Sequence, residues 1–184
     1  MSRIPAVDPS RATGQTAELL AAVEQKMGRV PNMMRVLANG PAGLSAYLAF
    51  SGALGDGRLP AALREQIALA VAEINQCDYC LSAHAAIGKM VGLDAAAIAA
   101  ARAAGAGDPK ATAVLVLARS LVVNRGNLTD AELTAARRAG LDDGEIVEVV
   151  ANVALNIFTN YLNHVAATDV DFPKVDALAA TRSA

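Results

Sequence analysis

Helix-start signals recur along this chain, whereas no stretch alternates between apolar and polar residues for long enough to predict a strand. The signals are threonine or aspartate caps, two of them with a glutamate three residues later, and prolines suited to a first helical turn. They lie at Pro31, Pro41, Pro60, Asp94, Asp108 with Pro109, Thr129 with Glu132, and Asp142 with Glu145. The last pair opens a helix predicted to run to about residue 166. The sequence therefore predicts an all-α fold.

The chain is long enough for one domain with its own core, and its composition suits closely packed helices. It has 184 residues, of which 54% are hydrophobic and only 3% aromatic. Alanine supplies much of the apolar share and has the highest helix propensity of all residues. We expect a single helical domain over residues 1–184, with about residues 1–12 and 180–184 loose at its ends.

Charge and hydropathy argue against nucleic acid and membrane as partners. The net charge is −2, and no run of lysine or arginine marks a nucleic-acid surface. No apolar run reaches the roughly 18 residues of a membrane span. The opening residues, MSRIPAVDPS, lack the apolar segment of a secretory signal. We therefore expect a cytoplasmic protein, whose thiols are kept reduced.

Both cysteines of the chain and one of its two histidines fall in residues 77–84, CDYCLSAH. On a helix, Cys77 and Cys80 are three residues apart and Cys80 and His84 are four apart, so each pair lies on one face. A dithiol at this spacing can close to a disulfide and reopen. An imidazole one turn away can take the thiol proton or hold the thiolate as an ion pair. Since Cys80 is nearer to His84, we expect Cys80 to meet the oxidant and Cys77 to resolve its sulfenic acid.

A zinc site, a c-type haem and a thioredoxin fold each fit this motif less well. Zinc would need a fourth ligand, and the only other histidine is His164, far along the chain. A c-type haem needs histidine directly after the second cysteine, where this chain has Leu81. The strand that precedes a thioredoxin motif is missing. Two buried cysteines and a core histidine that merely fill space stay an alternative. We expect neither a metal nor a cofactor.

Two glutamates are candidates to assist the dithiol. Glu73 lies one turn before Cys77 on the predicted helix, and Glu65 lies twelve residues before it. On an unbroken helix Glu65 would be about 18 Å from Cys77 along the axis. A role for Glu65 therefore requires a break between them, in residues 75–78. Otherwise both glutamates belong to a solvated helix face.

The predicted last helix carries a stripe of amides. They recur at intervals of four, four and three residues and so share one face: Asn152, Asn156, Asn160 and Asn163. Uncharged amides suit a half-buried polar seam, either between subunits or along a pocket. His164 lies beside the last amide, and we expect an interface or core histidine there, with a place in the site as the less favoured alternative. The opposite stripe is predicted to be core: Ile146, Val150, Val153, Ile157 and Tyr161.

Glu65, Cys77, Cys80 and His84 together form the pattern E-x11-C-x2-C-x3-H. Within the stretch EQIALAVAEINQCDYCLSAHAAIGKMVGLD, this pattern resembles the AhpD-like alkylhydroperoxidases of the carboxymuconolactone decarboxylase superfamily. The C-terminal stretch NVALNIFTNYLNHVAATDVDFP is similar to the branch called peroxidase-related. The resemblance covers about residues 30–173.

The resemblance implies an AhpD-like helical bundle with the CxxC at the start of a helix, assembled as a homo-oligomer, either trimer or hexamer. It implies thiol-dependent reduction of organic hydroperoxides, in which Cys80 attacks the peroxide and Cys77 forms the disulfide. His84 and Glu65 would then relay protons, and the helix should break just before Cys77. A thiol reductant, of lipoyl or thioredoxin type, would regenerate the dithiol.

One position departs from the family pattern. Some relatives carry histidine directly before the second cysteine, where this chain has Tyr79. A phenol with a pKa of about 10 accepts protons poorly at neutral pH, so we expect a shorter or slower relay. The decarboxylase branch lacks the cysteine pair, which disfavours lactone decarboxylation. A thiol–disulfide adaptor, and a non-catalytic assembly protein with an inert or redox-sensing cysteine pair, stay as alternatives.

Overall fold

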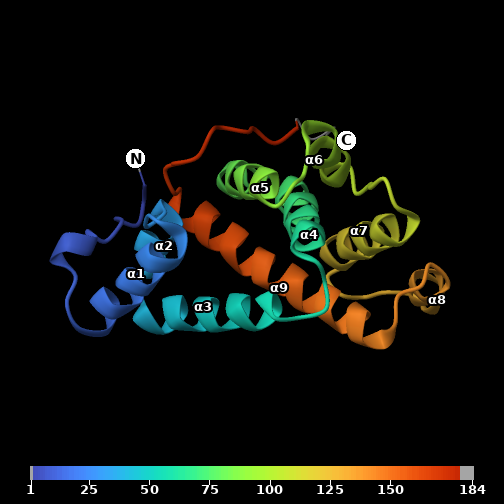
Figure 1. Ribbon diagram of the computed structural model, residues 1–184, viewed down its shortest axis with the longest axis horizontal. Helices are drawn as coiled ribbons and strands as arrows, with labels where there is room; N and C mark the ends of the chain where they lie inside the picture. The colour runs from blue at the N-terminus through green and yellow to red at the C-terminus, as the bar shows by residue number, and fades with distance from the viewer. Residues whose placement is uncertain (1, 179–184) are drawn as a thin grey trace.

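The computed structural model describes residues 2–178, and within that range every regular element is a helix (Figure 1). The elements are a 3₁₀ turn, η1 (Pro9–Arg11), and the helices α1 (Gly14–Met27), α2 (Asn32–Leu37), α3 (Pro41–Gly55), α4 (Ala61–Ile74), α5 (Asp78–Met90), α6 (Ala95–Arg102), α7 (Pro109–Val123), α8 (Asp130–Arg138) and α9 (Asp143–Ala166). The prediction of an all-α fold is confirmed.

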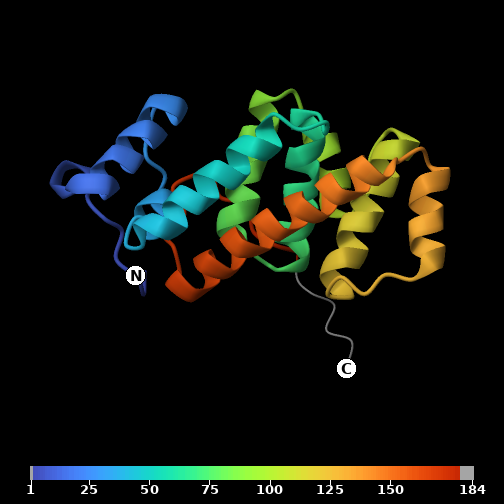
Figure 2. The same cartoon turned by 90° about the horizontal axis from the view of Figure 1, so that it is seen from below.

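The predicted helix caps form where the sequence indicated. Each of four side chains accepts a hydrogen bond from the backbone N–H three residues on: Asp94, Asp108, Thr129 and Asp142. The last two form complete capping boxes, because Glu132 and Glu145 bond back to the cap N–H groups. These bonds fix the starts of α6 to α9, and α9 then runs along much of the molecule (Figure 2).

α4 is the central helix of the domain. It packs against α5, α6, α7 and α9, and its residues 66–72 are all buried. Neighbouring helices enclose the second half of α4 on every side. In Figure 2, α3 and α9 run side by side, with α1 and α2 at one end and α7 and α8 at the other.

The chain reverses between α4 and α5, immediately before Cys77. Gln76 adopts the left-handed conformation, with φ of 54°. Its N–H bonds to the carbonyl of Glu73 at 3.1 Å, and the N–H of Cys77 bonds to the carbonyl of Ala72 at 2.9 Å. This is the Schellman pattern that ends a helix. Cys77 is at once the residue that closes α4 and the N-cap of α5, so the cysteine pair stands at a helix start, as predicted.

α9 buries a row of amides on its inward face and exposes apolar side chains on its outer face. The four amides of the stripe point inward and are buried. Two residues predicted to be core, Val150 and Tyr161, are 44% and 57% exposed, so that prediction was wrong for them. They belong to an exposed apolar stripe on the outer face, which we call the outer stripe: Val147, Val150, Ala154, Phe158, Tyr161 and Val165. The inward face of α9 therefore carries the amides together with buried apolar residues such as Val149 and Val153.

Residues 2–12, expected to be loose, are tied to the helices. The N–H of Val7 bonds to the carbonyl of Arg35 at 3.0 Å, and Nε of Arg35 donates to the carbonyl of Val7 at 2.9 Å. The N–H of Arg3 bonds to the carbonyl of Ala166 at the end of α9. Residues 180–184, also expected to be loose, lie outside the described residues.

Residues 169–178, which we call the C-terminal segment, run extended across the start of α5 (Figure 1). The N–H of Val175 donates to Ser82 Oγ at 2.9 Å, and the N–H of Ala177 donates to Asp78 Oδ1 at 2.8 Å. The segment thus holds the first turn of the helix that carries both cysteines.

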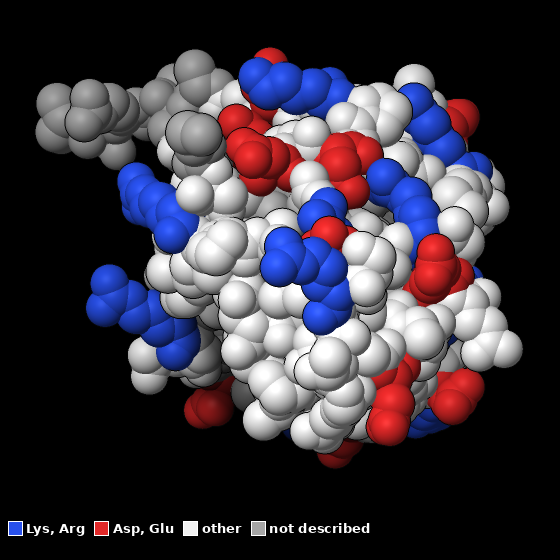
Figure 3. All heavy atoms as spheres, turned by 90° about the vertical axis from the view of Figure 1, so that its left-hand side faces the viewer, with Lys and Arg blue, Asp and Glu red and all other residues white. Residues whose placement is uncertain are grey.

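The surface shown in Figure 3 carries basic and acidic side chains of both signs, interspersed around a broad uncharged area. Among residues 2–178, no helix combines the length and the hydropathy needed to cross a membrane.

Candidate active site

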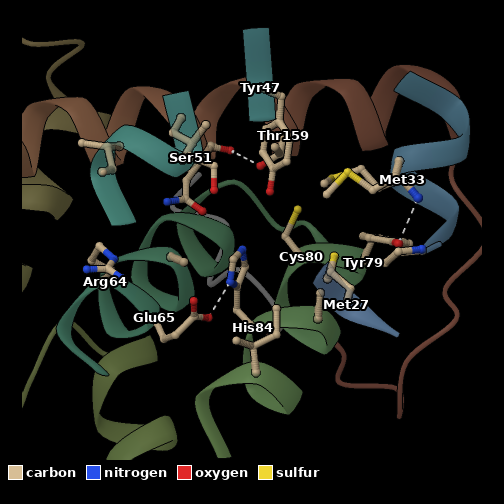
Figure 4. Close-up of a pocket in the computed structure, with 18 of the residues that line it drawn as sticks. Met27, Met33, Tyr47, Ser51, Arg64, Glu65, Tyr79, Cys80, His84 and Thr159 are labelled. Atoms are coloured by element: carbon tan, nitrogen blue, oxygen red, sulfur yellow. Dashed lines mark hydrogen bonds and ion pairs between the residues drawn. The ribbon is translucent and has the colours of Figure 1, made fainter. Parts of the chain in front are cut away.

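A pocket of about 310 Å³ opens between α1, α2, α3, α4, α5 and α9 (Figure 4). Much of its wall is apolar: Met27, Met33, Met34, Leu48, Ile87 and Phe172. Cys80, His84 and Glu65 line the same pocket, but Cys77 does not. Pockets of this size and character bind small, largely apolar molecules. Of the two sulfurs, only that of Cys80 therefore faces the space where such a molecule would bind.

The two cysteines are free thiols in contact through the first turn of α5. The N–H of Cys80 donates to Sγ of Cys77 at 3.4 Å, which makes that sulfur the cap of the helix. Their side chains are only 1% and 2% exposed. The hydrogen bond between the two side chains raises the pKa of Cys77 and lowers that of Cys80. Burial opposes the lowering at Cys80, whose thiolate is nevertheless the favoured anion.

Glu65 and His84 come together despite their separation on different helices. The turn at residues 75–77 folds α5 back along α4, so that His84 Nδ1 lies 2.8 Å from Glu65 Oε2. Burial lowers the pKa of His84, but the charge of Glu65 and its hydrogen bond outweigh it, and the net pKa is raised. The break just before Cys77 that the resemblance implied is present, and it brings Glu65 into the pocket.

Tyr79 lies between the cysteines and takes no part in a relay. Its hydroxyl donates to Asp171 Oδ1 at 2.9 Å and accepts the N–H of Met33 at 3.0 Å. Its ring meets Phe172 edge-on, with centroids 5.8 Å apart. Burial raises the pKa of this phenol. Tyr79 therefore joins α5 to α2 and to the C-terminal segment, and both of its hydrogen-bonding roles are already filled.

Glu73 and His164, the two less favoured candidates, do not line the pocket. Glu73 Oε2 accepts from Arg102 Nε at 2.6 Å, and its Oε1 accepts the N–H of Leu178 at 2.7 Å. It anchors α6 and the C-terminal segment to the end of α4. His164 is exposed. The sequence favours an interface or core histidine at His164. Because it is exposed, it is not a core residue of this chain.

The structure adds residues to the site that the sequence had not assigned to it. Asn163 Nδ2 donates to Sγ of Cys80 at 3.3 Å. The pKa of the Cys80 thiol is lowered most by Cys77, and then by Asn163, Asn160 and Thr159. Tyr47 of α3 also lines the pocket, and burial raises its pKa to about 12. The amide stripe was the signal for the α9 residues, and of its two interpretations, the pocket is the one found in this chain. Nothing in the sequence pointed to Tyr47.

Comparison with known proteins finds a described family that is similar to the segment holding this site. Residues 41–120 match the family named Carboxymuconolactone decarboxylase family. The matched segment is less than half of the chain. The match includes α4 and α5, and with them Glu65, Cys77, Cys80 and His84, but it ends before α9. The resemblance seen in the sequence is confirmed.

A curated relative of this chain is an alkyl hydroperoxide reductase of Mycobacterium tuberculosis. It is 34% identical over 114 residues, which cover 60% of this chain and 33% of that protein. The alignment thus spans about a third of the length of that relative.

Solved structures share the fold over nearly the whole chain. An uncharacterized peroxidase-related protein from Ralstonia eutropha, described as an alkylhydroperoxidase AhpD core, is 25% identical with a TM-score of 0.83, and the match covers 92% of both chains. The debrominase Bmp8, solved with 2,3,4-tribromopyrrole, has a TM-score of 0.78 at 18% identity, over 93% of this chain and 92% of its own. The second likeness shows the fold alone.

Proposed function

We propose that this protein is a thiol-dependent peroxidase that reduces organic hydroperoxides through a Cys77–Cys80 dithiol–disulfide cycle. One observation carries the proposal: Cys80, the cysteine with the lowered pKa, lines an apolar pocket together with the Glu65–His84 pair, while Cys77 contacts it from behind. The relatedness to an alkyl hydroperoxide reductase and to a peroxidase-related structure supports this choice of oxidant.

The proposed cycle begins with the Cys80 thiolate. Its sulfur attacks the outer oxygen of the hydroperoxide, the O–O bond breaks, and an alkoxide leaves with the electron pair. His84, kept protonated by Glu65, gives its proton to the alkoxide, which departs as an alcohol. Cys80 is left as a sulfenic acid.

The second half of the cycle restores the dithiol. The sulfur of Cys77 attacks the sulfenic acid, a disulfide forms, and water leaves with the Cys77 proton. A dithiol donor then reduces the disulfide and is itself oxidised. Both sulfurs are almost completely buried, which favours a donor on a thin flexible arm, such as a lipoyl group, over a thioredoxin-type protein surface. A cytoplasmic location, where such donors are kept reduced, is part of the proposal.

The same burial weighs against the adaptor alternative. A thiol–disulfide adaptor must form a mixed disulfide with another protein, and this requires access to one sulfur. In this protein the accessible approach to Cys80 is through the pocket, which suits a small molecule. The redox-sensor alternative differs from the peroxidase only in turnover, which can be measured directly.

The decisive experiment compares peroxide consumption by the wild type, Cys80→Ser and Cys77→Ser, with cumene hydroperoxide and hydrogen peroxide in turn and dihydrolipoamide as donor. We expect catalytic turnover by the wild type, none by Cys80→Ser, and a single oxidation event without cycling by Cys77→Ser. No wild-type turnover, with a disulfide that forms and is reduced cleanly, would establish the sensor or adaptor instead.

We further propose that the protein is a homo-oligomer, as the resemblance implied. The outer stripe supports this, because a row of exposed apolar side chains along the longest helix is costly unless another surface covers it. Size-exclusion chromatography with light scattering would give the mass, and either a trimer or a hexamer agrees with the proposal, whereas a monomer contradicts it.

A further inference from the structure

We propose that Asn160 and Asn163 of α9 hold the Cys80 thiolate and, together with Cys77, set the reactivity of this sulfur. The inference rests on the proposed function only in taking Cys80 as the reacting thiolate. It assigns a catalytic role to a helix that lies outside the matched segment 41–120.

Asn163 contacts the sulfur directly. Its Nδ2 donates to Sγ of Cys80 at 3.3 Å, and both side chains are buried. An N–H donor held against a buried sulfur favours the anion over the thiol, because the bond strengthens when the acceptor is charged.

Asn160 supplies a second donor in a fixed orientation. Its Oδ1 accepts a hydrogen bond of 2.9 Å from Asn75 Nδ2, in the turn between α4 and α5. The amide plane is therefore set, and its Nδ2 is directed away from Asn75. That nitrogen is fully buried and has no hydrogen-bond partner among the described residues. A buried unpaired donor is costly, and an anion on the neighbouring Cys80 would satisfy it.

The other half of the amide stripe provides an internal comparison. Asn152 Nδ2 donates to the carbonyl of Glu148, and Asn156 Nδ2 donates to the carbonyl of Asn152, both at 2.8 Å. These two amides satisfy themselves on their own helix, as polar residues in helices often do. Asn160 and Asn163 do not, and they are the two that lie at the level of Cys80. The same residue type thus behaves differently only where the sulfur is present.

His84 is paired with Glu65 and not with the sulfur of Cys80. Its Nδ1 is taken by Glu65, and no hydrogen bond joins it to the sulfur of Cys80 within the described residues. The lowered pKa of Cys80 comes from Cys77 first and then from Asn163, Asn160 and Thr159. The roles then divide by chemistry: amides that never titrate hold the anion, and the imidazolium keeps its proton for the departing alkoxide.

Titratable groups face Cys80 from three helices. On α5 they are Cys77, Tyr79 and His84, on α4 Glu65, and on α3 Tyr47. Burial, and to a smaller extent the charge of Cys80, raises the pKa of Tyr47 and Tyr79, so both phenols stay neutral between pH 5 and about pH 10.

The test measures the rate of Cys80 alkylation by iodoacetamide from about pH 5 to 10, in a Cys77→Ser background so that one thiol reacts. Asn163→Leu removes the donor at similar volume, and Asn163→Ala repeats the test without overpacking. Asn152→Leu is the matched control, since it removes an amide of the same stripe that bonds only to its own helix.

We expect Asn163→Leu and Asn163→Ala to move the pH profile upward by about one unit, so that alkylation at pH 7 slows about tenfold while the limiting rate at high pH is unchanged. Asn152→Leu should leave the profile in place. A profile that does not move with either Asn163 variant, or that moves as far with Asn152→Leu, overturns the inference. Because no peroxide is used, the result is independent of whether the wild type turns over hydroperoxides.

Discussion

The Glu65–His84 pair predicts a stability loss that depends on pH. In the native protein the carboxylate of Glu65 raises the pKa of His84 against the opposing effect of burial. Glu65→Gln keeps the size of the side chain and one acceptor oxygen but removes the charge. Burial then acts on His84 without its counterweight, and the pKa of His84 should fall.

The sign and size follow from the pair itself. A histidine whose folded pKa lies above its unfolded value of about 6.5 contributes stability below that pH, and the contribution is lost as the pH rises through the folded pKa. Hydrogen bonds between charged groups contribute about 1.5–3 kcal/mol and neutral ones about 1 kcal/mol. With side chains 21% and 18% exposed, the pair is only partly screened by solvent. Glu65→Gln should therefore cost about 1–2 kcal/mol at pH 6 and well under 1 kcal/mol at about pH 9.

Urea unfolding at the two pH values measures this difference. A loss of about 1–2 kcal/mol moves the midpoint by roughly 0.5–1 M. The control is Glu132→Gln, in the exposed capping box of α8 with no histidine beside it, which should lose the same small amount at both pH values. An equal loss for Glu65→Gln at pH 6 and pH 9 would refute the charge pairing.

Three further predictions concern residues around the site. Tyr79→Phe should cost about 2 kcal/mol in urea unfolding, because the ring keeps its contact with Phe172 while the N–H of Met33 loses a buried acceptor. Peroxide turnover should survive it, and a loss of turnover at unchanged stability would give the phenol a chemical role. His164→Ala should leave alkylation and turnover intact, and lost turnover in a preserved oligomer would contradict its place outside the pocket. Phe158→Glu in the outer stripe should lower the mass measured by light scattering, and an unchanged mass would place the interface elsewhere.

Local rules sufficed for the helices and their ends. Caps such as Thr129 with Glu132 act through backbone groups three residues away, so the sequence states them completely. The cysteine pair and His84 could be predicted equally well, because Cys77, Cys80 and His84 follow one another at intervals of about one helical turn. The prediction of a core stripe on α9 failed for the opposite reason. Periodicity divides a helix into faces, but it does not say which face turns inward. Val150 and Tyr161 lie on the face that is exposed to solvent.

The helical class, the helix starts and the dithiol motif could all be predicted from the sequence, since they depend on residues within about one turn of each other. The sequence also offered Glu65 as a candidate beside Glu73, but only the resemblance to a family favoured Glu65, because periodicity does not reveal a contact across a chain reversal. Only the tertiary structure decided that the reversal at Gln76 pairs Glu65 with His84. It alone decided that α9 turns its amides toward Cys80. Burying the sulfur of Cys80 between helices requires polar partners there, and those partners come from a helix far along the chain, at Asn160 and Asn163.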